Sequence, residues 1–132
     1  MQSYVVRSKV NKIGKDSKIR YYGVPVLYGQ ITEKRLAKDV EEGTSLTEAD
    51  FLSAVCSLKR LMQKYLSQGK SVKLEGIGTF YVSASSEGFD TPEECTPSKV
   101  KARRICFTAD YELKNILPSI KYDKVNRPKK KR

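Results

Sequence analysis

The chain has 132 residues, of which 31% are charged and 39% hydrophobic, and this size suggests a single domain that buries about two thirds of its unfolded surface. Lys and Arg number 26 against 15 Asp and Glu, a net charge of +11, and a small chain this basic usually binds a polyanion such as DNA, RNA or an acidic membrane. The sequence contains no histidine, no P-loop and no metal-binding constellation, so we do not expect an enzyme.

The charge is unevenly distributed along the chain. Residues 1–30 carry six basic and one acidic side chain, residues 84–98 carry four acidic and no basic ones, and residues 99–132 carry twelve basic and three acidic ones. The middle of the chain, residues 31–83, is nearly neutral. Such segregation indicates a binding footprint more than a uniformly solvated surface.

The three cysteines, Cys56, Cys95 and Cys106, are widely spaced and form no Cys-x-x-Cys pair. We therefore expect reduced thiols, no bound metal and no cofactor. Cys56 is expected to pack in a helix as a small apolar residue. The sequence shows no signal-peptide h-region and no run near the roughly 20 apolar residues of a membrane span. These features predict a cytoplasmic protein without a membrane or small-molecule partner.

The first 30 residues are expected to form β structure. Residues 4–10 and 19–28 are rich in β-branched and aromatic side chains, and a polar stretch from residue 11 to 18 separates them. This pattern predicts two strands joined by a loop. Pro25 confines the second strand to an edge or to an irregular segment, because proline has no N–H to donate.

Two helices are predicted between residues 32 and 69. Thr32 is a suitable N-cap for the first helix, and Gly43 is suited to its C-terminus. Thr47 caps the second helix and Asp50 completes a capping box. Apolar side chains then recur every three or four residues for over four turns, at Phe51, Leu52, Val55, Leu58, Leu61, Met62, Tyr65 and Leu66. This face predicts a core helix and also permits a subunit interface, which amphipathicity alone does not distinguish.

Strands are expected at residues 72–75 and 79–83, and again from Val100 to Thr108. Ile105 and Phe107 should face the core and Arg104 the opposite side. Lys101 and Arg103 share the parity of Ile105, so they are solvent-exposed only if the strand projects past the core or a β-bulge intervenes.

The remaining segments are a loop, a short helix and a tail. Residues 84–98 hold two prolines and a glycine and have no strand pattern. Asp110 can cap a last helix that reaches Leu117 and is limited by Pro118. Residues 123–132 end in a run of basic side chains, which predicts a disordered basic tail.

The turn Gly76-Ile77-Gly78-Thr79-Phe80 follows the two helices and precedes the basic strand. From residue 31 to 122 this order resembles the bacterial histone-like DNA-binding family of HU and integration host factor. The resemblance implies an α+β fold with two N-terminal helices, a three-stranded antiparallel sheet with an arm loop, and a C-terminal helix. Residues 1–30 would be the N-terminal β extension of a longer HU-like subgroup with a shortened arm. The resemblance also implies a homodimer that binds double-stranded DNA in the nucleoid, mainly through phosphates and DNA deformability.

The arm region departs from the family. The family's Arg-Asn-Pro arm tip is absent, and Asp90-Thr91-Pro92-Glu93-Glu94 stands in its place. Carboxylates would be repelled by phosphates, so we do not expect Pro92 or Pro97 to intercalate. The body and the tail should then carry the affinity, and Lys114 is at a position commonly basic in the family. The residues predicted to contact DNA are Lys73, Lys99, Lys101, Arg103, Arg104, Lys114, Lys129, Lys130, Lys131 and Arg132.

Sequence-tolerant DNA binding by an architectural protein is therefore the leading hypothesis. One alternative is an assembly protein that retains the HU-like fold for dimerisation and does not bind DNA strongly. A second is a sequence-specific helix-turn-helix regulator, although little basic surface remains on the two helices for a major groove. RNA binding is compatible with the charge, but the sequence has no aromatic stacking motif of the RRM type.

Overall fold

The computed structural model describes residues 1–13 and 16–126, and the side chains of residues 1–10 and 17–126. The chain forms two compact units, one of residues 1–30 together with the segment from residue 116 onwards, and one of residues 31–115. We predicted that an HU-like domain would run from residue 31 to 122. Residues 116–122 belong instead, by their contacts, to the same unit as the N-terminal strands.

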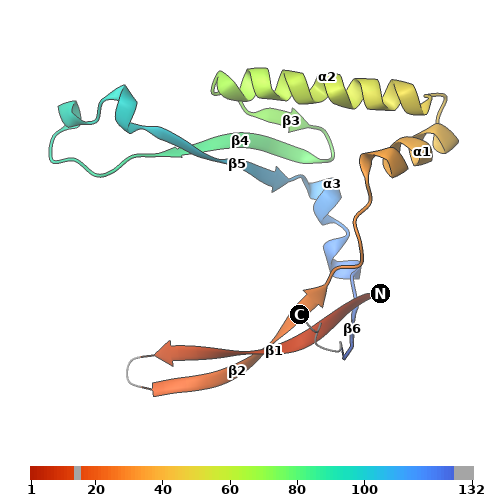
Figure 1. Ribbon diagram of the computed structural model, residues 1–132, viewed down its shortest axis with the longest axis horizontal. Coiled ribbons are helices and arrows are strands. Elements are labelled where there is room, and N and C mark those ends of the chain that lie inside the picture. Colours follow the sequence, from red (N-terminus) through yellow and green to blue (C-terminus); the bar gives the residue numbers. More distant parts are fainter. Residues whose placement is uncertain (14–15, 127–132) are drawn as a thin grey trace, which may run out of the picture. The chain divides into compact units, whose positions relative to one another are not determined.

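The first unit is a three-stranded sheet with the order β2-β1-β6. β1 (Gln2–Ile13) pairs antiparallel with β2 (Asp16–Val26) along the whole length of both strands, and pairs parallel with β6 (Tyr122–Lys124) at its beginning (Figure 1). The hairpin is longer than predicted, because most of the expected loop at residues 11–18 is strand. Pro25 lies in edge strand β2, as expected.

β6 also corrects the predicted tail. Asp123 and Lys124, which we expected to begin a disordered segment, pair with Ser3 and Tyr4 of β1.

The buried side chains of this sheet lie near the start of β1 and the end of β2. Val5 and Val26 are 7% and 8% exposed, and the rings of Tyr4 and Tyr122 meet edge to face with centroids 6.5 Å apart.

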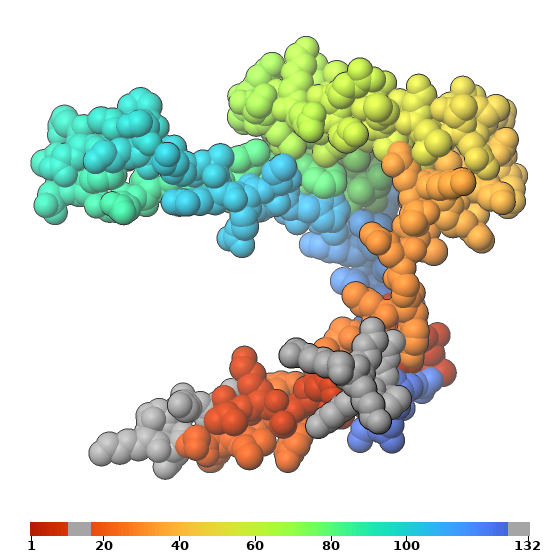
Figure 2. Space-filling model, viewed as in Figure 1, coloured from red at the N-terminus to blue at the C-terminus, as the bar shows by residue number. Residues whose placement is uncertain are grey.

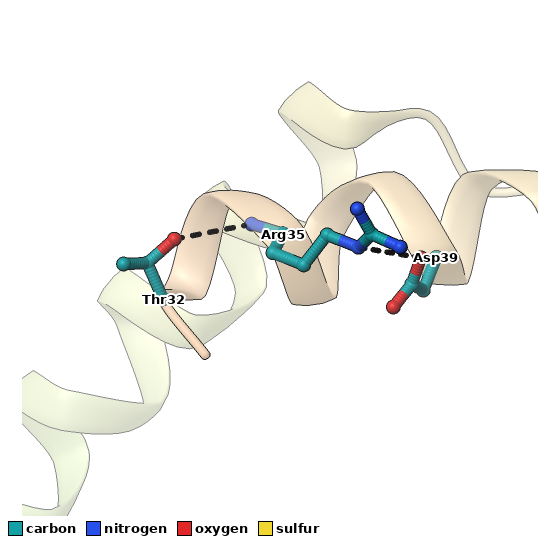
Figure 3. A network of polar contacts seen from close by, with 3 residues as sticks. All are labelled: Thr32, Arg35 and Asp39. Carbon is teal, nitrogen blue, oxygen red and sulfur yellow. Dashed lines mark hydrogen bonds and ion pairs between the residues drawn. The ribbon is translucent and has the colours of Figure 1, made fainter. Parts of the chain in front are cut away.

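The second unit begins with two helices, as predicted. In α1 (Glu33–Gly43) the hydroxyl of Thr32 accepts a hydrogen bond from the N–H of Arg35 at 3.4 Å. The Arg35 Nε lies 3.3 Å from the Asp39 carboxylate one turn later (Figure 3). Both side chains of this ion pair are more than half exposed, so it contributes only a few tenths of a kcal/mol.

α2 (Glu48–Ser67) starts with the predicted capping box. The Thr47 hydroxyl accepts from the N–H of Asp50 at 3.1 Å, and the Asp50 carboxylate accepts from the N–H of Thr47 at 3.2 Å. Cys56 lies in this helix, but its side chain is exposed in the single chain. The expectation that Cys56 is packed as a small apolar residue is therefore wrong at the level of one chain.

A three-stranded antiparallel sheet follows, with the order β3-β4-β5. Its strands are β3 (Val72–Leu74), β4 (Gly78–Ser85) and β5 (Lys101–Ala109). Gly76 turns β3 into β4 with φ 76°, in a turn closed by the N–H of Ile77 donating to the Leu74 carbonyl at 3.0 Å. Gly78 is required for a different reason: a Cβ there would lie 2.3 Å from the Thr108 carbonyl oxygen.

The C-terminal helix is shorter than predicted. α3 (Tyr111–Lys114) is a single turn, and a separate 3-10 turn covers Leu117–Ser119. Asp110 occupies the N-cap position but makes no side-chain cap hydrogen bond. Its carboxylate accepts instead from the backbone N–H of Gly76 at 3.0 Å. The predicted loop after β4 contains two short 3-10 turns, at Pro92–Glu94 and Pro97–Lys99.

α2 lies against one face of this sheet, next to the glycine turn (Figure 1). Figure 2 shows that the segment between β4 and β5, in cyan, extends beyond the part of the sheet that α2 covers. Among the described residues of this unit only Ala37 and Leu66 are buried apolar side chains, at 0% and 8% exposure. The single chain therefore leaves the apolar residues of α2 and of the sheet, apart from Leu66, half-buried or exposed.

Candidate nucleic-acid interface

A β-bulge decides which residues of β5 share a face. Phe80 pairs with Phe107 and Val82 with Ile105 in regular register. The register then shifts, since Ser83 pairs with Arg104 while the next residue, Ala84, pairs with Ala102. Arg103 is thus the extra residue of the bulge.

The bulge moves Lys101 to the polar side of the sheet. Residues directly opposite each other in an antiparallel pair lie on the same face, so Ala102 joins the apolar face that carries Val82 and Ile105. Lys101, opposite Ser85, joins the face of Arg104. The β-bulge, one of the two arrangements that would leave Lys101 exposed to solvent, is therefore present.

We call this polar side the outer sheet face. Alternation along the strands and the register across them assign its members: Lys73, Thr79, Tyr81, Ser83, Ser85, Lys101, Arg104, Cys106 and Thr108. The three strands contain no Asp or Glu. The face is therefore positive and rich in hydroxyl groups, a composition suited to phosphate oxygens.

Lys101, Arg103 and Arg104 are brought together at the far end of the β4–β5 ribbon. All three are exposed, and the Nε of Arg103 donates to the Ser85 hydroxyl at 3.0 Å. That hydrogen bond draws the side chain of the bulge residue across to β4, whose Ser85 belongs to the outer sheet face. These three residues form a basic cluster with no carboxylate in the adjoining strands.

Three other predicted residues lie apart from this cluster. Lys73 is on edge strand β3, across the sheet and about 13 Å further along the strand direction, and its Nζ lies 4.0 Å from the Glu75 carboxylate. Lys99 lies in the loop before β5 with its Nζ 5.1 Å from the ring centroid of Phe89. Lys114 is the last residue of α3. Lys129, Lys130, Lys131 and Arg132 lie outside the described residues.

The opposite face of the sheet forms an apolar groove with α2, of about 820 Å³. Its walls include Val55, Leu58 and Met62 from the helix and Val82 and Ile105 from the sheet. The Ile105 side chain is 69% exposed. A groove of this size and composition is an unusual surface for a single chain to leave uncovered.

The sequence prediction overlooked a second set of basic residues, in the first unit. Arg7, Lys9, Lys18 and Arg20 are exposed, and the pairing Lys9↔Arg20 puts them on one face of the β1–β2 hairpin. The sequence signal is that the basic residues are two apart in each strand, which puts each pair on one face. Only the register shows that the two pairs share the same face.

No group of three His, Cys, Asp or Glu residues that could hold a metal ion occurs among the described residues. In the same part of the chain, no helix is long and apolar enough to cross a membrane.

Two helices, a glycine turn and a three-stranded sheet with one basic face define an α+β protein of the HU type. The chain matches, over residues 2–129, the family model of an HU domain fused to a wHTH, Ig or glycine-rich motif. It belongs to this family, and the resemblance found in the sequence is confirmed. The family is defined by its HU domain, in agreement with the prediction of a non-enzymatic protein.

Two solved structures have a similar fold. One is a protein from Bacteroides vulgatus ATCC 8482, provisionally assigned as a bacterial DNA-binding protein, with a TM-score of 0.59 and 12% identity over 96% of this chain and 50% of that chain. This chain thus spans about half the length of that protein. The other is Anabaena HU in a cocrystal with DNA, with a TM-score of 0.50 and 17% identity over 67% of this chain and 99% of that chain. No curated protein matches the sequence.

Proposed function

We propose that this protein binds double-stranded DNA with little sequence preference, as a histone-like architectural protein. The observation that carries the proposal is the outer sheet face, which presents Lys101 and Arg104 next to Arg103 in strands without a carboxylate. Cations arranged on a sheet face contact phosphates, and phosphate contacts carry little sequence information.

The comparisons support the same function. The chain belongs to an HU-domain family, and one structure with a similar fold is an HU protein solved together with DNA. A protein that acts in this way would work in the cytoplasm on the nucleoid. The acidic loop makes insertion of Pro92 or Pro97 between base steps unfavourable, so we infer that affinity comes from the sheet face and the basic tail.

A homodimer is part of the proposal. The groove between α2 and the sheet would be covered by the same surface of a second copy, as an isologous interface requires. Burying its apolar walls would stabilise the pair by roughly 25 cal/mol for each Å² removed from water. In this arrangement two outer sheet faces would contact one DNA duplex.

The test is fluorescence anisotropy with labelled duplexes of about 30 base pairs, in two unrelated sequences, across a salt titration. The variant K101Q/R104Q removes two charges from the outer sheet face. The matched control, K34Q/K38Q, removes two charges from exposed positions of α1.

We expect tight binding of both duplexes by the unaltered protein. In K101Q/R104Q the slope of log K against log salt should become shallower by about 2 per bound chain, since each phosphate contact contributes about 0.9. K34Q/K38Q should bind like the unaltered protein. A wild-type protein that binds neither duplex at low salt would contradict the proposal and favour an assembly protein of HU-like fold.

A further inference from the structure

Among the residues of the β1–β2 hairpin whose side chains are described, all the charged ones lie on one face. Because opposite residues of an antiparallel pair share a face, the pairs Lys9↔Arg20 and Arg7↔Tyr22 fix that face, and Lys18 belongs to it two residues before Arg20. We call Arg7, Lys9, Lys18 and Arg20 the hairpin basic face. It belongs to the first unit, whereas the outer sheet face belongs to the second.

The other side of the hairpin has the opposite character. The pairs Val10↔Ile19 and Ser8↔Tyr21 lie there, and Val10, Ile19 and Tyr21 are 54%, 64% and 72% exposed. Over residues 7–10 and 18–22, basic residues thus gather on one side and apolar residues on the other, which indicates a face that meets a specific kind of partner.

The four basic side chains are all exposed. Within the described residues, none of them forms an ion pair. Among residues whose side chains are described, the only carboxylate that the register puts on this face is Asp123, opposite Ser3 at the other end of the strand. Within that part of the chain, no carboxylate lies beside the four cations.

The spacing of these charges suits a regular polyanion. Residues two apart along a strand are about 7 Å apart, and residues directly opposite each other are about 5 Å apart. A depression of about 440 Å³ lies alongside them, lined in part by Arg7, Lys9 and Tyr22. Duplex DNA presents one phosphate charge for every 1.7 Å or so of its axis, so the four cations would meet several phosphates at once.

We infer that the hairpin basic face is a second DNA-binding surface, which contacts the phosphate backbone of the same duplex or of a neighbouring one. The inference rests on the proposed function for the identity of the polyanion. It adds a contact site in the first unit, built from residues other than the predicted DNA contacts. A two-stranded β-ribbon is narrow enough to follow a DNA groove.

Lysine footprinting on the unaltered protein tests this inference directly. The full chain is acetylated with an amine-reactive ester in the presence and absence of a duplex of about 30 base pairs, and the modified lysines are located by mass spectrometry. Lys9 and Lys18 should lose reactivity when DNA is bound, whereas Lys34 and Lys38 on α1 should keep theirs. The protection should disappear in 1 M salt, where the screening length falls to about 3 Å.

The variant K9Q/R20Q gives a second readout, with K34Q/K38Q as its matched control. For this variant the slope of log K against log salt should be shallower by about 2 per chain, because two phosphate contacts are lost. Circular dichroism checks that the variant is folded. The lysine footprint uses the unaltered protein and so does not depend on the folding of the variant.

The outcomes separate the two proposals. Binding by the unaltered protein with Lys9 and Lys18 as reactive as Lys34 and Lys38 would overturn this inference and leave DNA binding by the outer sheet face intact. Absence of binding by the unaltered protein would overturn the proposed function, and the inference with it. Protection of Lys9 and Lys18 by vesicles of anionic phospholipid but not by DNA would also overturn the inference, in favour of a membrane surface.

Discussion

The carboxylate of Asp110 accepts a hydrogen bond from the backbone N–H of Gly76 at 3.0 Å, across 34 residues of sequence. The N–H of Asp110 in turn donates to the carbonyl of Ile77 at 2.9 Å. The two bonds join the β3–β4 turn to the end of β5, so they fix the glycine turn in the second unit. An aspartate at this position could cap the helix or bind the turn. The Asp110 carboxylate binds the turn and does not cap α3.

Replacing Asp110 by alanine should lower the free energy of unfolding by about 2 kcal/mol, because a part-buried N–H would lose a charged acceptor. Asp110→Asn keeps an oxygen at the same place and should cost about half as much. Urea unfolding followed by circular dichroism, at one protein concentration, measures both. Equal losses in the two variants would show that the carbonyl oxygen of an amide cannot replace the carboxylate here.

Gly78→Ala should be among the most damaging single substitutions in the chain. The new methyl group would lie 2.3 Å from the Thr108 carbonyl oxygen and 2.5 Å from the ring of Phe107. Overpacking and strain of this kind cost about 3 kcal/mol. Gly88→Ala is the control, because nothing lies within 4 Å of its added methyl group, and its thermal unfolding should be almost unchanged. A well-folded Gly78→Ala protein would contradict the close approach of β4 and β5.

The β-bulge makes a prediction about two deletions of equal length. Deleting Arg103 removes the extra residue and leaves Ala102 opposite Ala84, so the faces of β5 are preserved. Deleting Ala102 puts a cation, Lys101 or Arg103, opposite Ala84 on the apolar groove. We expect the first deletion to fold and the second to lose several kcal/mol of stability, since a charge would then lie on an apolar surface. Chemical denaturation compares them, and equal stability would argue against the bulge.

Ile105→Asp should prevent self-association. Its side chain is 69% exposed in one chain yet lies in the apolar groove, and a carboxylate there would be buried without a partner in a dimer. Sedimentation velocity should show a shift towards monomer. Val100→Asp, which replaces a 48% exposed side chain not included in the lining of the groove, should sediment like the unaltered protein. If Ile105→Asp stays fully associated, the groove is not the interface.

The helices and the glycine turn could be predicted because their signals are local. Thr47 and Asp50 form the expected capping box within four residues of sequence, and Gly76 adopts the positive φ that a tight turn favours. The role of Asp110 at the glycine turn could not be predicted, because its partner, the N–H of Gly76, is distant in the sequence.

The two basic faces illustrate the same difference. Strand parity identified Arg104, but the position of Lys101 depends on the bulge, and bulges leave no residue signature in this strand. The hairpin basic face depends on the pairing of Lys9 with Arg20, which the composition of either strand leaves undetermined. The pairing of neighbouring strands therefore determines which residues lie on each of the two basic faces.

The parallel pairing of β6 with β1 has a consequence for the order of folding. β6 follows β1 only after the whole second unit has been made, while β1 and β2 adjoin in sequence. During synthesis the hairpin can form early but must remain a two-stranded ribbon, which is marginally stable in water. Its third strand arrives only after residues 31–115 have been made. Closing so long a loop is slow, so completion of the sheet of the first unit should follow synthesis of the second unit.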